Sequence, residues 1–127
     1  MQTAQVNLDL LRKLLQNNRD AIKNALELFI DSTEDDMELL SAQIRNERYV
    51  DAARIAHSLK SRFVYLGNEE LILLVRELEQ SLRNTTKENS KQLIPDLFYG
   101  LNRMIFFCMN QVLAEIKLLK AQPTSLA

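Results

Sequence analysis

The chain has 127 residues, a length that fits one domain able to close a hydrophobic core without disulfides or a structural metal. Hydrophobic residues make up 46% of it, and only two glycines and two prolines are present, which leaves little turn chemistry for a β-rich fold. Sixteen basic and seventeen acidic residues give a formal net charge of −1, so no overall field attracts nucleic acid or an anionic membrane. We therefore predict a single all-α domain over residues 1–127 that contacts neither nucleic acid nor membrane.

The cysteine content and the absence of long apolar runs bear on the compartment. The single cysteine, Cys108, cannot form an internal disulfide and lies in an apolar helical segment, where core packing is its expected role. The sequence shows no secretory signal, and no apolar run reaches the ~18 residues of a membrane span. These features predict a cytoplasmic domain, although a longer parent protein could still be anchored in a membrane.

The first half of the chain predicts three helices. Residues 7–16 carry leucines at helical spacing and predict a short amphipathic helix that covers one end of the fold. Residues 19–47 predict one long helix, because their apolar pattern runs without glycine or proline; a capping-box-like start at Thr33 would instead split it. A third helix runs from about Val50 to Gly67, whose missing Cβ suits the left-handed residue that often ends a helix.

The second half predicts two more helices. Asn68 is a plausible N-cap for a helix with a leucine-rich core face, and the polar residues 84–89 predict a loop. The last helix runs from about Ile94, with Pro95 either in its first turn or at a kink, and the tail from about residue 121 is expected to fray. Four substantial helices with short links predict an antiparallel up-down-up-down four-helix bundle with a short N-terminal capping helix.

The only histidine, His57, lies on the third of these helices. An apolar stripe recurs there at three- and four-residue steps, formed by Ala52, Ile55, Ala56, Leu59, Phe63 and Leu66. At ~100° per residue, His57 lies roughly 150° from the centre of this stripe, which places the imidazole in water. The same outer face carries Val50, Ala53 and Val64, a mildly apolar patch of the kind that often marks a docking surface.

The run Ala56-His57-Ser58-Leu59-Lys60, followed by Gly67, Leu71, Leu74, Leu78 and Glu79, resembles the histidine-containing phosphotransfer (HPt) domains of multistep two-component phosphorelays. The resemblance extends to the number, order and length of the helices over nearly the whole chain. It implies that His57 accepts a phosphoryl group from an aspartate of one receiver domain and passes it to an aspartate of another. The implied partners are receiver domains of response regulators or of hybrid histidine kinases.

The neighbours of His57 also have expected roles, of which that of Lys60 is implied by the resemblance. Lys60, three residues on, shares its face and would stabilise the phosphoryl oxygens, and the hydroxyl of Ser61 could add a hydrogen bond. Val50, Ala53 and Val64 would contact the receiver. Mg²⁺ would come with the receiver, so no cofactor and no metal site are expected in this chain.

Two departures from the family pattern leave alternatives open. The family usually has glycine at the position of Ser61 and a small residue at that of Val64, so a receiver loop would approach a more crowded histidine here. A non-catalytic adaptor that binds a receiver or kinase without carrying phosphate is therefore the main alternative. A helical dimerisation module is a third, because apolar residues surround most of the last helix and allow a homodimer, although a monomer is expected.

Other candidate sites are weaker. Zinc sites need three or four ligands, and the chain has one histidine and one cysteine. The acidic run at residues 31–38 lacks the glycine and ligand spacing of a calcium loop and predicts a solvated helix face. Phe106, Phe107 and Met109 predict core or a helix-pairing surface rather than a cofactor site.

Overall fold

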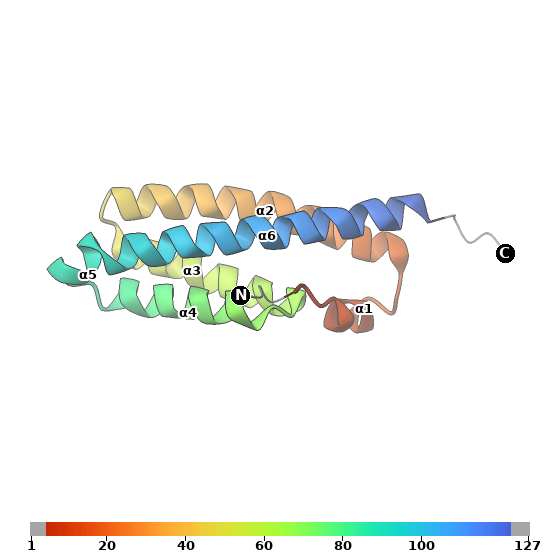
Figure 1. Ribbon diagram of the computed structural model, residues 1–127, viewed down its shortest axis with the longest axis horizontal. Helices are drawn as coiled ribbons and strands as arrows, with labels where there is room; N and C mark the ends of the chain where they lie inside the picture. Colours follow the sequence, from red (N-terminus) through yellow and green to blue (C-terminus); the bar gives the residue numbers. More distant parts are fainter. Residues whose placement is uncertain (1–4, 123–127) are drawn as a thin grey trace.

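The computed structural model describes residues 5–122, which form helices and turns and contain no β-strand. The elements are α1 (Asp9–Leu14), α2 (Arg19–Arg45), α3 (Tyr49–Phe63), the 3-10 turn η1 (Val64–Leu66), α4 (Glu69–Arg83), α5 (Lys87–Lys91) and α6 (Leu93–Ala121). The colours of Figure 1 show that each of the four long helices runs antiparallel to the next. The predicted all-α antiparallel bundle is confirmed.

The four long helices occupy the corners of the bundle. Helix α2 packs against α3 and α6, and α4 packs against the same two helices. The helices α3 and α6 therefore stand at opposite corners, and a surface on the outside of α3 is separated from one on the outside of α6. The core between the helices consists mainly of leucine, isoleucine, valine and alanine side chains.

Helix α1 covers one end of the bundle, where α2 and α6 extend beyond α3 and α4 (Figure 1). It is shorter than the predicted 7–16, but Leu8 is buried in the core, and Leu11 and Leu15 pack against that core. The backbone amide of Asn7 donates to the carbonyl of Leu66 at 2.7 Å, which fixes the segment before α1 to the end of η1. The predicted capping helix is present.

The long helix α2 is continuous through Thr33, so the alternative of a split at this residue is wrong. Thr33 is fully buried on the core face, where a helix start would be difficult to accommodate. Helix α3 is held to α2 by an ion pair of 2.7 Å between Arg62 and Asp36. Its extension η1 ends at Gly67 with φ at 61°, as the sequence predicts, and an added Cβ there would lie 2.6 Å from the carbonyl oxygen of Asn7.

Asn68 caps α4 and links it to α6. Its side-chain oxygen accepts from the backbone amide of Leu71 at 3.1 Å, and its amide nitrogen donates to Cys108 Sγ at 3.1 Å. Cys108 is buried in the core, as predicted. Burial raises the pKa of this thiol, although the bond from Asn68 opposes the shift, so the group is an unreactive thiol at neutral pH.

The loop predicted at residues 84–89 is only partly correct, because α5 begins at Lys87. A capping box starts this helix: the Thr86 hydroxyl accepts from the Asn89 amide at 3.0 Å, and the Thr86 amide donates to the Asn89 side chain at 2.7 Å. Pro95 lies in the first turn of α6, where its missing N–H has no helical partner to lose. Helix α6 ends at Ala121, and the predicted tail beyond residue 122 lies outside the described residues. No helix within residues 5–122 is long and apolar enough to cross a membrane.

Gly100 offers a direct test of the packing between α4 and α6. It lies inside α6, and a Cβ added there would meet only Leu74 Cδ2 at 3.8 Å, an ordinary van der Waals contact. We expect Gly100→Ala to stabilise the fold by about 0.5–1 kcal/mol, because alanine has the higher helix propensity and restricts the unfolded chain. Urea unfolding measures the change, and a loss of stability would mean that the two helices approach more closely than described.

Candidate functional site

His57 projects from α3 into solvent, as the apolar stripe predicts. Its side chain is 57% exposed, on the side of α3 that faces away from the core. One ring nitrogen is held: Nδ1 lies 3.1 Å from Oε2 of Glu79 on α4. An ionised carboxylate can only accept hydrogen bonds, so the proton of the neutral imidazole belongs on Nδ1 and the lone pair on Nε2.

Glu79 is the centre of this cluster. Its side chain is only 9% exposed, and three side chains donate to it. His57 and Arg83 reach Oε2, with Arg83 Nε and Nη2 both at 3.1 Å, while Lys60 Nζ donates to Oε1 at 3.0 Å. Burial alone raises the pKa of this carboxyl, but the hydrogen bonds from Lys60, Arg83 and His57 outweigh it and hold the pKa below its usual value. Glu79 is therefore ionised at neutral pH.

The two cations give the cluster its charge. Lys60 and Arg83 both pair with the single carboxylate of Glu79, so the group carries a net charge of +1 when His57 is neutral. Lys60 is three-quarters buried, whereas the Arg83 side chain is half exposed. An exposed imidazole beside excess positive charge is an arrangement that can hold an anionic group.

The hydroxyl of Ser61 does not point toward the position of a phosphoryl group on His57, where a hydrogen bond was predicted. Its hydroxyl donates to the backbone carbonyl of His57 at 3.4 Å, a bond one turn back along α3. In this rotamer the hydroxyl is engaged by the backbone, and a bond to a group on the imidazole needs a rotation about χ1. The side chain is exposed on the same helix as His57 and adds bulk beside it.

The predicted apolar patch is smaller than expected. Val50 and Val64 are exposed, at seven residues on either side of His57, and so share its face. Ala53 is 0% exposed, so its assignment to the outer face was wrong. The reason is that α3 packs against both α2 and α4, which buries a wider arc of the helix than one stripe suggests. Ala53 belongs to the core and is too deeply placed to contact a partner.

No role was predicted for Glu79 or Arg83. Glu79 entered the sequence prediction only as part of the family pattern. Its position next to Leu78, on the core-facing side of α4, could also have indicated a functional carboxylate. A charge at such a position needs partners. Arg83, one turn on, is a favourable i,i+4 partner for Glu79 that could have been found from spacing. The contacts from α3 depend on the packing of α3 and α4, which no local pattern shows.

Residues 24–122 match the family model described as the Hpt domain. The chain belongs to the Hpt domain family. The match covers most of α2 and all of α3, α4, α5 and α6, and so contains every residue of the cluster around Glu79. No curated protein and no solved structure gives a significant match to the chain.

Membership of the Hpt family implies phosphotransfer in two-component phosphorelays, in which Hpt domains interact with receiver domains. Within residues 5–122, no group of three or more histidine, cysteine, aspartate or glutamate side chains is placed to hold a metal ion.

Proposed function

We propose that His57 is the phosphoacceptor of this Hpt domain and relays a phosphoryl group between aspartates of two receiver domains. The observation that carries the proposal is the hydrogen bond between His57 Nδ1 and the buried Glu79 carboxylate, which leaves the lone pair on Nε2 of a side chain that is 57% exposed. A nucleophile for phosphoryl transfer needs an accessible lone pair in a fixed direction more than it needs additional catalytic groups.

The transfer of the phosphoryl group requires no proton transfer. Nε2 forms a bond to phosphorus as the bond between phosphorus and the aspartyl oxygen of the receiver breaks, and the aspartate leaves as a carboxylate. The ring retains its proton on Nδ1 and becomes positively charged, and Glu79 Oε2 stabilises that charge. In the reverse direction an aspartate oxygen attacks phosphorus, the N–P bond breaks and the imidazole becomes neutral again.

Lys60 is proposed to bind the phosphoryl oxygens. Arg83 is proposed to remain paired with Glu79. Lys60 and His57 donate to different oxygens of one carboxylate, so the ammonium lies near the ring. A small change in the lysine side chain would bring Nζ from Glu79 to a phosphoryl oxygen, while Arg83 keeps the carboxylate satisfied. Ser61 can contribute a hydrogen bond only after leaving the His57 carbonyl.

The receiver is proposed to dock on the face of α3 around His57. Val50 and Val64 are exposed at two turns before and after the imidazole and offer apolar contact on both sides of it. Mg²⁺ is proposed to belong to the receiver, where it would neutralise the transferring phosphoryl group. This chain then supplies the nucleophile, the cations and the docking surface.

The test is phosphoryl acceptance from a panel of phosphorylated receiver domains, measured by intact mass at neutral to basic pH. We expect the addition of one phosphoryl group that is lost on acid treatment and survives base, the stability typical of an N–P bond. Absence of label from every receiver, with receiver binding still detected, would favour the adaptor. Absence of both label and binding would count against any role in a phosphorelay.

The bulk at Ser61 gives a second prediction. We expect Ser61→Gly to speed transfer from a phosphorylated receiver, because it removes a side chain beside His57, while costing about 0.5 kcal/mol of helix stability. Ser58→Gly is the matched control, since Ser58 is also exposed on α3 and carries the same propensity cost on a different side of the helix. Unchanged or slower transfer by Ser61→Gly, relative to Ser58→Gly, would show that crowding does not limit docking.

A further inference from the structure

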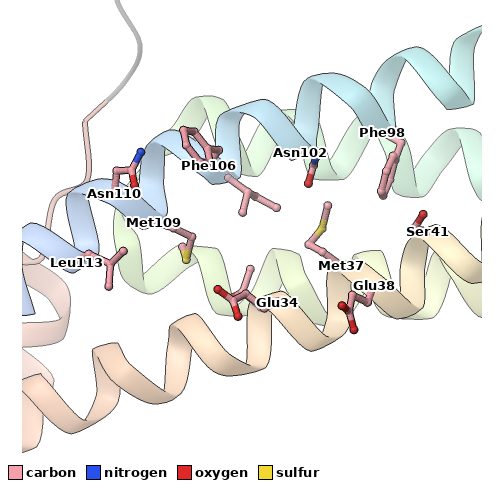
Figure 2. A pocket seen from close by; sticks show the side chains of 12 residues that line it. Glu34, Met37, Glu38, Ser41, Phe98, Asn102, Phe106, Met109, Asn110 and Leu113 are labelled. Carbon is pink, nitrogen blue, oxygen red and sulfur yellow. The ribbon is translucent and has the colours of Figure 1, made fainter.

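A long groove runs between α2 and α6, on a side of the bundle away from His57. It has a volume of about 550 Å³. Figure 2 shows Met37 of α2 and Phe98 of α6 pointing into the space between the two helices. The residues that line the groove are Thr33, Glu34, Met37, Glu38, Ser41, Phe98, Asn102, Ile105, Phe106, Met109, Asn110 and Leu113.

The wall formed by α6 is mainly apolar and partly exposed. Phe106 is 66% exposed and Leu113 is also exposed, although both line the groove. Met37 and Met109 also line the groove and are buried. Methionine side chains adapt to the shape of a bound partner, and exposed aromatic groups are typical anchors of binding surfaces.

The wall formed by α2 is acidic. Glu34 and Glu38 lie one turn apart along its edge (Figure 2), and neither has an ion pair with any residue from 5 to 122. Like charges at this spacing repel each other, so a cation between them is favourable. The facing polar residues on α6 are the neutral amides Asn102 and Asn110, and no basic side chain lines the groove.

The shape of the groove favours a helix as its occupant. Its α6 wall extends from Phe98 to Leu113, which at 1.5 Å per residue is about 22 Å, the length of a helix of about 15 residues. The lining residues recur at three- and four-residue steps on both walls, which is the spacing of the side-chain ridges between which another helix packs its own side chains. Helix binding in such grooves uses anchors at the same spacing.

We propose that this groove binds an amphipathic helix of a partner protein, with an apolar stripe facing α6 and lysine or arginine residues along the edge facing Glu34 and Glu38. Since α6 and α3 stand at opposite corners of the bundle, the helix can be bound while a receiver occupies the face around His57. The site gives this domain a second binding surface that needs no phosphoryl transfer.

The test uses the whole chain and two labelled helical peptides of about 15–18 residues with the same leucine stripe, one with lysines and the other with glutamates on the flanking edge. Fluorescence anisotropy should show that the lysine peptide binds about tenfold more tightly, because two ion pairs replace two like-charge contacts. The double variant Glu34→Lys with Glu38→Lys should reverse the preference, and Phe106→Asp should weaken both peptides.

The matched control is the double variant Asp31→Lys with Asp35→Lys. These two residues are exposed on α2 at the same spacing but do not line the groove, and they change the net charge equally. Preservation of the lysine preference in this control would support the groove as the site, and loss of it would overturn the proposal in favour of general charge attraction. Equal binding of both peptides by the parent chain would also overturn it.

Two further measurements separate this proposal from its rivals. Sedimentation equilibrium of the parent chain should give a monomer; a dimer that Phe106→Asp dissociates would mean that a second copy occupies the groove, which contradicts the proposal. Phosphoryl acceptance should be unchanged in all the groove variants. A loss of acceptance in folded Phe106→Asp would show that the groove is part of the transfer surface and not a separate site.

Discussion

Replacing His57 with glutamine should abolish phosphoryl acceptance while the bundle remains folded. The glutamine amide can still donate to Glu79 Oε2, in place of the bond of 3.1 Å from Nδ1, so the buried carboxylate keeps its partners. The amide nitrogen has no available lone pair, so no N–P bond can form. Intact mass after incubation with a phosphorylated receiver measures the loss, and thermal unfolding confirms the fold.

A comparison of His57→Gln with His57→Ala separates the loss of the nucleophile from the loss of the hydrogen bond to Glu79. Both variants lose the nucleophile, but alanine also removes one of the donors to Glu79 and should destabilise the fold by about 0.5–1.5 kcal/mol more than glutamine does. Label that persists in folded His57→Gln would place the phosphoacceptor elsewhere in the chain. Equal stability of the two variants would show that the bond between Nδ1 and Glu79 contributes nothing to folding.

The fold was predictable because its helices carry their own signals. The long apolar repeat of α2, Gly67 at the end of η1 and Asn68 at the start of α4 are local features, and each lies where the sequence places it. Helix α5 was missed because its capping box pairs Thr86 with Asn89, where glutamate or glutamine is the usual partner. The ends of a helix can therefore be predicted from sequence where the capping residues are the common ones.

The site was predictable only in part, for a physical reason. Periodicity places His57 and Lys60 on one helix, but it gives one buried direction and cannot show that α3 has a neighbour on each side. With neighbours on both sides, Ala53 is fully buried, and α4 brings Glu79 to within 3.1 Å of the imidazole. The hydrogen bond that defines the tautomer of His57 is thus a tertiary contact between residues 22 positions apart in sequence.

Replacing Glu79 with glutamine should slow phosphoryl acceptance by about 10–100-fold, the range found when a carboxylate that orients a metal-bound histidine is removed. Glutamine keeps the size of the side chain but has no negative charge to stabilise the ring as the N–P bond forms. Its amide nitrogen must also face one of the groups that now donate to the carboxylate. Single-turnover transfer from a phosphorylated receiver measures the rate. Glu77→Gln is the matched control, an exposed glutamate two residues away on α4.

The same substitution should change how stability depends on pH. The pKa of Glu79 is lowered from 4.5 in the fold, since the bonds from Lys60, Arg83 and His57 outweigh the effect of burial. Above that value the carboxyl is ionised in both states and its full contribution to stability is present; as the pH falls through the folded pKa, the contribution is lost. Urea unfolding between about pH 3 and 7 should therefore show a steeper acid decline for the parent than for Glu79→Gln. Parallel curves, together with unchanged transfer, would mean that the carboxylate neither anchors the two cations nor holds the imidazole.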